Sequence, residues 1–308
     1  FADIGVAIKP GLCLLVERLC KGFDTLFTVI DAGGLPVPGA KICERKSNTE
    51  YAGRTDAQGR VTVSGVSSPD TGTKLDLYAR KANRFSATAR YAVSNDLGAE
   101  SPENINVTCG KNCAEILVSW QTGVKITEGY IQYALKTPGK NDLAPDDIVK
   151  KAERVNSFST HRNESCEMNG YSVCLDGLMP GAEYVYKVGT GDFWSEAKVF
   201  KTIPAEGDFA FAVLADTHNV CGEAMRTALK SDPDVSFFAH AGDFVSAGGV
   251  YDDWQKYFAD AGGLHAVYPT VSVSGNHDLS DGTGANYRLT HSNPANGVGG
   301  APKGLYYY

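Results

Sequence analysis

Three short apolar runs near the carboxyl-terminal end of the chain, at residues 209–215, 235–241 and 268–274, have the length and composition of buried β-strands. Two segments with helix-compatible patterns, 222–230 and 251–261, separate these runs. The order strand, helix, strand, helix, strand is typical of βαβ units, whose parallel strands end at the same edge of a sheet. We therefore expect the residues that follow the three strands to meet at one edge.

A polar motif follows each of these strands: DTH at 216–218, GD at 242–243 and GNHD at 275–278. Two metal ions held close together need an anionic oxygen shared by both, because that charge offsets their mutual repulsion. The motifs together predict half of a two-metal hydrolytic site. The alternative is that the Asp and Asn side chains cap turns and helices while the histidines are packed.

Each residue type has an expected role in such a site. Asp243 is the natural bridge between the metals, and Asp216 and His218, two residues apart on one loop, can both turn to one metal. Asn276 offers a neutral oxygen to the other metal. His277 is then left to act on the substrate.

The motifs resemble those of the calcineurin-like metallophosphoesterase superfamily, whose hallmark is D-x-H, then GD, then GNH followed by D or E. The separations here are 27 residues from Asp216 to Asp243 and 33 residues from Asp243 to Asn276. The resemblance implies that residues 205–308 form the first half of an α/β metallophosphatase sandwich. It also implies that water activated between two metal ions attacks phosphorus in line.

The region 109–204 reads as an all-β sandwich. Its strand signals are ILVSWQT at 116–122, taken as a first strand, LDGLMPGAEYVYKVG at 175–189, and WSEAKVFKT at 194–202 as the last strand. The fibronectin type III-like domain at the N-terminus of purple acid phosphatases carries the same signals. Residues 109–308 are therefore similar to the purple acid phosphatase branch.

The chain departs from the purple enzymes at two positions that affect the metals. His218 and Ser246 stand where those enzymes have Gly and the Tyr that binds ferric iron. An imidazole and carboxylate set suits Fe, Zn or Mn, so we expect two divalent or trivalent ions of open identity and no purple colour. Asp278 stands where those enzymes usually have Glu, and either carboxylate could orient His277 by hydrogen bonding.

The later motifs of the superfamily, an isolated His and a G-H-x-H, do not occur after Asp278, and the chain begins with Phe1. We interpret the chain as a fragment of a larger protein. Taken alone, it is expected to be inactive and to expose an apolar sheet edge.

Residues 22–108 have the pattern of another β-sandwich. A strand-like run at 27–30 leads into a Pro/Gly turn at 34–40, and a D-x-x-G turn follows at 55–61. This region resembles the Ig-like or carboxypeptidase-regulatory-like modules of many secreted enzymes, and we assign it a structural role. Residues 1–21 are interpreted as a linker or the end of a preceding segment.

The net charge of −7, with no long basic run, argues against nucleic acid as a bulk partner. No uninterrupted apolar stretch approaches the roughly 18 residues of a membrane span. Asn106 and Asn163 begin glycosylation triplets. Six of the eight cysteines fall in local pairs, which are common in domains from oxidising compartments: Cys13 with Cys20, Cys109 with Cys113, and Cys166 with Cys174. We therefore expect a secreted, periplasmic or cell-surface protein.

Three other residues near the motifs have open roles. His240 is expected to be packed or hydrogen-bonded at a strand end, and His291 lies either in a loop beside the substrate or in the core. Cys221 lies near an expected helix start, which could lower the pKa of its thiol. The favoured alternative is that Cys221 is an inert packed thiol.

The sequence therefore predicts a metallophosphoesterase that hydrolyses phosphate monoesters of small molecules. Two alternatives stay open. The first is a phosphodiesterase or nucleotidase on the same scaffold, because selectivity lies in loops. The second is a non-catalytic surface or adhesion protein with a degenerate phosphatase domain.

Overall fold

The computed structural model describes residues 12–16, 25–46, 49–63, 74–82, 84–86, 89–92, 95–96, 100–139, 142–161 and 164–297. These residues fall into two compact units, one built mainly from the first 96 residues and one from residues 97–162 and 168–308. No helix among the described residues is long and apolar enough to cross a membrane.

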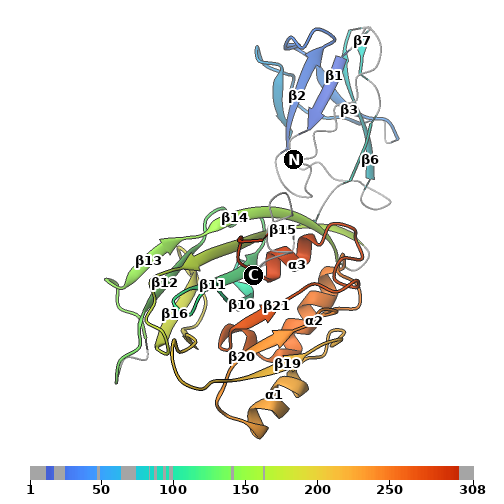
Figure 1. Ribbon diagram of the computed structural model, residues 1–308. Helices are drawn as coiled ribbons and strands as arrows, with labels where there is room; N and C mark the ends of the chain where they lie inside the picture. The colour runs from blue at the N-terminus through green and yellow to red at the C-terminus, as the bar shows by residue number, and fades with distance from the viewer. Residues whose placement is uncertain are drawn as a thin grey trace. The chain divides into compact units, whose positions relative to one another are not determined.

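The first unit is a β-sandwich (Figure 1). One sheet has the order β1-β2-β5, and the other has the order β4-β3-β6-β7 with β8 also paired to β6. Alternating residues such as Phe27 and Val29 are fully buried between the sheets, as the two-residue period of a strand requires. The strands are β1 (Leu12–Val16), β2 (Thr25–Asp31), β3 (Lys41–Glu44), β4 (Thr49–Glu50), β5 (Arg60–Val63), β6 (Lys74–Lys81), β7 (Arg84–Phe85) and β8 (Ala89–Ala92), followed by the two-residue β9 (Asn95–Asp96).

The second unit begins with another sandwich. One sheet has the order β13-β12-β16-β17 with β18 paired to β16, and the facing sheet contains β14-β15-β11-β10. The strands are β10 (Glu103–Cys109), β11 (Ile116–Thr122), β12 (Tyr130–Leu135), β13 (Ile148–Lys151), β14 (Glu153–His161), β15 (Glu164–Leu175), β16 (Glu183–Thr190), β17 (Phe193–Trp194) and β18 (Lys198–Lys201). The structure thus adds β10 in front of the run at 116–122 that the sequence suggested as a first strand.

Packing of two aromatic rings organises the core of this second sandwich. Trp120 is 1% exposed and stacks on Tyr171 with ring centroids 5.4 Å apart. A Cβ atom at Gly129 would lie 2.4 Å from the Tyr171 ring, so only glycine fits beside the stack. The apolar positions of 116–122 therefore bury their side chains as the sequence pattern predicted.

The α/β part follows with the expected order of elements. It contains β19 (Ala210–Leu214), α1 (Gly222–Ser231), β20 (Val235–His240), α2 (Tyr251–Ala261), the 3-10 turn η1 (Leu264–Ala266), β21 (Thr270–Ser272) and α3 (Ala285–Thr290). The three strands are parallel, in the order β21-β20-β19. Residues of α1 and α2 form one core with the strands, whereas Phe211 and Val213 on β19 are 50% and 65% exposed on the other face.

The sandwich and the α/β part share one continuous sheet. β10 pairs in parallel with β21 at Thr108 and Thr270, and the Thr270 hydroxyl donates to the Val107 carbonyl over 3.3 Å. The buried Tyr186 hydroxyl on β16 also donates to the Ala266 carbonyl over 2.7 Å. These bonds fix the sandwich against the strand that carries the third motif (Figure 1).

Cys166 and Cys174, one of the local cysteine pairs, are both free cysteines. Both residues lie on β15, eight positions apart, which corresponds to roughly 26 Å along a strand, whereas bridged cysteines have Cα atoms about 4.4–6.8 Å apart. Cys109 and Cys113 are also free cysteines. Cys20 lies outside the described residues.

Asn106 is also not available as a glycosylation acceptor in the folded protein. Its side chain is 0% exposed, and its amide donates to the Thr290 carbonyl over 2.9 Å. The second candidate, Asn163, lies outside the described residues.

We expect Trp120→Ala to lower the free energy of unfolding by about 3–5 kcal/mol, because it leaves a cavity beside Tyr171. Urea denaturation followed by circular dichroism measures this loss. Trp194→Ala is the matched control, because Trp194 is only partly buried and lies under Lys187 at the surface. Equal losses in the two variants would contradict the packing role of Trp120.

Candidate metal centre

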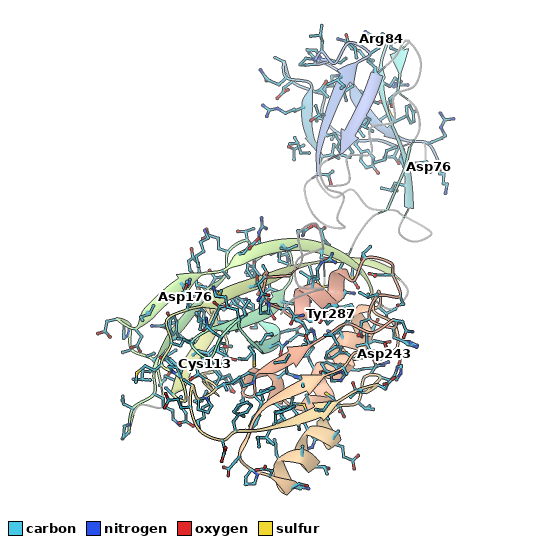
Figure 2. All side chains as sticks on the ribbon, viewed as in Figure 1. Asp76, Arg84, Cys113, Asp176, Asp243 and Tyr287 are labelled. Carbon is cyan, nitrogen blue, oxygen red and sulfur yellow. The ribbon has the colours of Figure 1, made fainter. Side chains whose placement is uncertain are left out.

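The three motif loops meet where the parallel strands end. The Asp216 N–H donates to the Gly242 carbonyl, and the His218 N–H donates to the Asp243 carbonyl, each over 3.1 Å. The first motif loop is therefore hydrogen-bonded along its length to the second. Asp243, labelled in Figure 2, lies in the loop that follows β20.

The backbone of these loops has an unusual conformation. Asp216, His218 and Asp243 have φ angles of 52°, 45° and 54°. This left-handed region costs a non-glycine residue about 1–3 kcal/mol, and such residues gather at functional sites because the surrounding structure holds them there. The backbone bonds between the loops provide that support.

Three side chains converge on one small space. Candidate ligand atoms of His218, Asp243 and His277 all lie within 4.8 Å of one another. The two imidazole rings meet edge to face, with centroids 4.7 Å apart. Two imidazoles and one carboxylate form a donor set that suits Zn, Fe or Mn, so these residues fit the metal that the motifs predict.

Two glycines allow the loops to approach. A Cβ atom at Gly275 would lie 2.1 Å from the Asp243 Oδ1 atom, and one at Gly242 would lie 2.7 Å from the Gly275 nitrogen. Real Cβ atoms do not come so close to other atoms. Glycine at both positions is therefore a packing requirement of the site, independent of metal binding.

The structure brings the other predicted ligands near this group but not into it. Asp216 is 72% exposed, and its Oδ1 atom lies 4.0 Å from the Nε2 atom of His218. Asn276 is exposed in the loop between Gly275 and His277. His277, which the sequence assigned to the substrate, lies beside His218 and Asp243.

Asp278 has a different role from the predicted one. It is 0% exposed, and its carboxylate accepts hydrogen bonds from the N–H groups of Asp243 (2.9 Å), Gly275 (2.8 Å) and Val245 (3.2 Å). Burial raises the pKa of this carboxyl, while the three N–H groups oppose that rise. Asp278 therefore joins two motif loops through their backbones instead of orienting the His277 ring.

The Ser246 carbonyl orients the His277 ring. It lies 2.8 Å from the Nδ1 atom, and because a carbonyl can only accept, Nδ1 must carry the proton. The Nε2 atom is then the ring nitrogen left for a metal or a substrate. Sequence reasoning missed this contact because a backbone carbonyl leaves no signal in the residue pattern.

His240, His265, His291 and Cys221 are packed. His240 stacks on Phe244 and bonds to the Thr217 hydroxyl over 3.0 Å, and His291 is 1% exposed against the same Phe244 ring. Burial raises the pKa of Cys221 to about 12 and lowers that of His291 well below its usual value. The favoured alternative for Cys221, an inert packed thiol, agrees with this burial, and His291 lies in the core.

A carboxylate and two imidazoles meet at the carboxyl edge of a parallel sheet, an arrangement that suits a metal-dependent hydrolase. Residues 102–202 match the family model of the purple acid phosphatase N-terminal domain, and residues 209–303 match that of the calcineurin-like phosphoesterases. These matches confirm the resemblance to calcineurin-like metallophosphoesterases of the purple acid phosphatase branch. No curated protein matches the chain.

Among solved structures, the fold is similar to the purple acid phosphatase PPD1 of yellow lupin (Lupinus luteus), with 14% identity and a TM-score of 0.51. The match covers 89% of this chain and 61% of the lupin chain. A second match is PhoD, with 15% identity and a TM-score of 0.39; it covers 58% of this chain and 40% of that chain. A third is the FN1–FN3 domains of chicken CNTN1, with 17% identity and a TM-score of 0.28; it covers 61% of this chain and 66% of that chain. The lupin enzyme shows the shared fold of sandwich and α/β domain.

We expect Gly275→Ala to weaken binding of Zn²⁺ or Mn²⁺ about 10-fold or more, because the added methyl group separates the loop from Asp243. Isothermal titration calorimetry measures this change. Ser274→Ala, at the adjacent position, is the control and should bind normally. Unchanged affinity in Gly275→Ala would show that the close contact of the loops does not shape the centre.

We also expect acid to destabilise the α/β part. Burial lowers the pKa of His265 from 6.5 to about 3 and that of His240 from 6.5 to about 4. Between 6.5 and these values the unfolded chain binds more protons than the folded chain, so the free energy of unfolding falls as the pH drops below 6.5. By pH 4 the loss from His240 alone is on the order of 3 kcal/mol.

Urea denaturation at pH 7 and pH 5 measures this dependence. His265→Phe should flatten it, because a phenyl ring keeps the stacking on Tyr257 without taking up a proton in the unfolded state. An equally steep dependence in the variant would show that other groups cause the acid sensitivity.

Proposed function

We propose that the full-length protein is a metal-dependent phosphoesterase that hydrolyses phosphate monoesters through a two-metal site. The observation that carries this proposal is the convergence of His218, Asp243 and His277 within 4.8 Å, inside the segment that matches the calcineurin-like phosphoesterases. The chain spans 61% of the length of the lupin phosphatase, so the activity is assigned to the whole protein.

In this proposal His218 and Asp216 hold one metal, Asn276 holds the other, and Asp243 is shared by both. Metal ions bound there would lower the pKa of water toward neutrality and offset the negative charge of a phosphate group. The exposure of Asp216 and Asn276 leaves their oxygens accessible to such ions. The close contact of Gly275 with Asp243 keeps the shared carboxylate near both loops.

His277 is proposed to act on the substrate through its Nε2 atom. The Ser246 carbonyl holds the proton on Nδ1, so the neutral ring presents a lone pair at Nε2. When the ring is protonated, the same atom can donate a hydrogen bond to a phosphate oxygen or a proton to the leaving alkoxide.

Export of the protein stays a prediction of the sequence. The cysteine pairs that supported it do not form among the described residues. Thiol counting on the purified protein would address this point separately from its activity.

We expect the full-length protein to contain two metal ions and to hydrolyse p-nitrophenyl phosphate faster than bis(p-nitrophenyl) phosphate. Asp243→Asn should lower kcat about 100-fold or more and reduce the metal content, because a neutral amide cannot offset two cations. Asp234→Asn is a matched control, because Asp234 is an exposed residue before β20. Metal analysis and steady-state kinetics measure both effects.

The outcomes separate the candidate functions. Faster turnover of the diester would favour the phosphodiesterase alternative. A metal-free wild-type protein that hydrolyses neither compound would overturn the proposal in favour of a binding or adhesion protein.

A further inference from the structure

The loop formed by residues 246–249, which joins the second motif to α2, contacts His277 twice. The Ser246 carbonyl holds the ring at Nδ1 over 2.8 Å. The Gly248 N–H donates to the His277 carbonyl over 2.9 Å. The loop therefore holds both the backbone and the ring of His277.

This loop has little means of holding itself in place. Gly248 and Gly249 have no side chains, and glycine loses more conformational freedom on folding than any other residue. A Cβ atom at Gly248 would lie 1.9 Å from the Asp278 carbonyl oxygen, so a side chain is excluded at this position. Groups outside the loop therefore hold it. The Ser246 N–H donates to the Asn219 Oδ1 atom over 3.1 Å, and the Ala247 N–H donates to the Asp253 Oδ2 atom over 3.0 Å.

Three side chains from other elements hold its carbonyls. The amide of Asn286, on α3, donates to the Gly248 carbonyl over 2.8 Å and to the Ser159 hydroxyl over 2.7 Å. The Ser159 hydroxyl, on β14 of the sandwich, donates to the Gly249 carbonyl over 3.1 Å. The Trp254 indole adds a bond of 2.9 Å to the Gly248 carbonyl.

These bonds form a continuous chain from the sandwich to the candidate catalytic histidine. Asn286 is 1% exposed and Trp254 is 0% exposed, so water competes weakly for their hydrogen bonds. Displacement of the loop would move the Ser246 carbonyl away from the Nδ1 atom. The ring would then be free to exchange its proton between the two nitrogens.

We propose that Ser159 and Asn286 are positioning residues, through which the second sandwich, the one that contains β14, sets the tautomer and the orientation of His277. The catalytic part of this inference rests on the proposed phosphoesterase function. The structural part, the state of the His277 ring, can be measured without any activity. The sandwich is then a component of the active site in addition to being a flanking module.

The test compares Ser159→Ala with Ser159→Thr in the full-length protein, because threonine restores the hydroxyl. Ser157→Ala is the matched control, since it removes a buried hydroxyl from the same strand outside this chain of bonds. For p-nitrophenyl phosphate we expect Ser159→Ala to lower kcat about 10-fold with KM changed less than about two-fold. Ser159→Thr should recover most of the loss, and Ser157→Ala should match the wild type.

A second readout uses the metal-free protein. Nitrogen-15 spectra of labelled histidine, assigned with His277→Gln, report which ring nitrogen carries the proton. In the wild type we expect the proton on Nδ1, and in Ser159→Ala a mixture of the two tautomers. A pure Nδ1 proton in Ser159→Ala, or an equal change in Ser157→Ala, would overturn the proposal.

The two readouts fail independently. If the ring changes only in Ser159→Ala while the wild type hydrolyses no phosphate ester, the positioning role stands and the proposed function fails. If the wild type is active and neither kcat nor the ring changes in Ser159→Ala, the function stands and the positioning role fails.

Discussion

The buried carboxylate of Asp278 is the interaction on which the candidate site depends. By accepting three backbone N–H groups, from Asp243, Val245 and Gly275, it ties the second motif loop to the third. A buried carboxylate is costly unless its oxygens are bonded in this way, so neither loop can move without exposing unpaired polar groups. Asp243, with its left-handed backbone, and His277 lie in the two loops that this carboxylate joins, and both belong to the group of converging candidate ligands.

The site is supported from outside the α/β part as well. β10 extends the sheet beside β21, and Ser159 and Asn286 hold the loop that orients His277. The buried amide of Asn106 and the Ser119 hydroxyl both donate to the Thr290 carbonyl at the end of α3. The sandwich therefore contacts the sheet, the helix after the third motif and the loop after the second motif through specific polar groups.

Much of the fold could be predicted from local patterns. The apolar runs that begin at residues 209, 235 and 268 predicted three strands, and the segments between them predicted two helices. The structure contains all five elements, with ends within a few residues of the predicted ones. His218, Asp243 and His277 could be predicted as site residues because each follows a strand of a parallel sheet. The role of Asp278 could not be predicted, because three backbone donors from two loops leave no trace in residue types. Cys166 and Cys174 show a related limit: residues close in the sequence lie far apart when both are on one extended strand.

By itself, the sequence determined the order of the elements, the burial of alternating positions in the strands and the donor types at the ends of three strands. These features depend on the periods of helices and strands and on the chemistry of single side chains, both of which are local. Only the tertiary structure decided which donors converge, which loop carbonyl orients His277 and which strand of the sandwich reaches the site. Those outcomes depend on contacts between residues that are as far apart in the sequence as Ser159 and Asn286. Such contacts stabilise the protein only after folding has brought the two residues together.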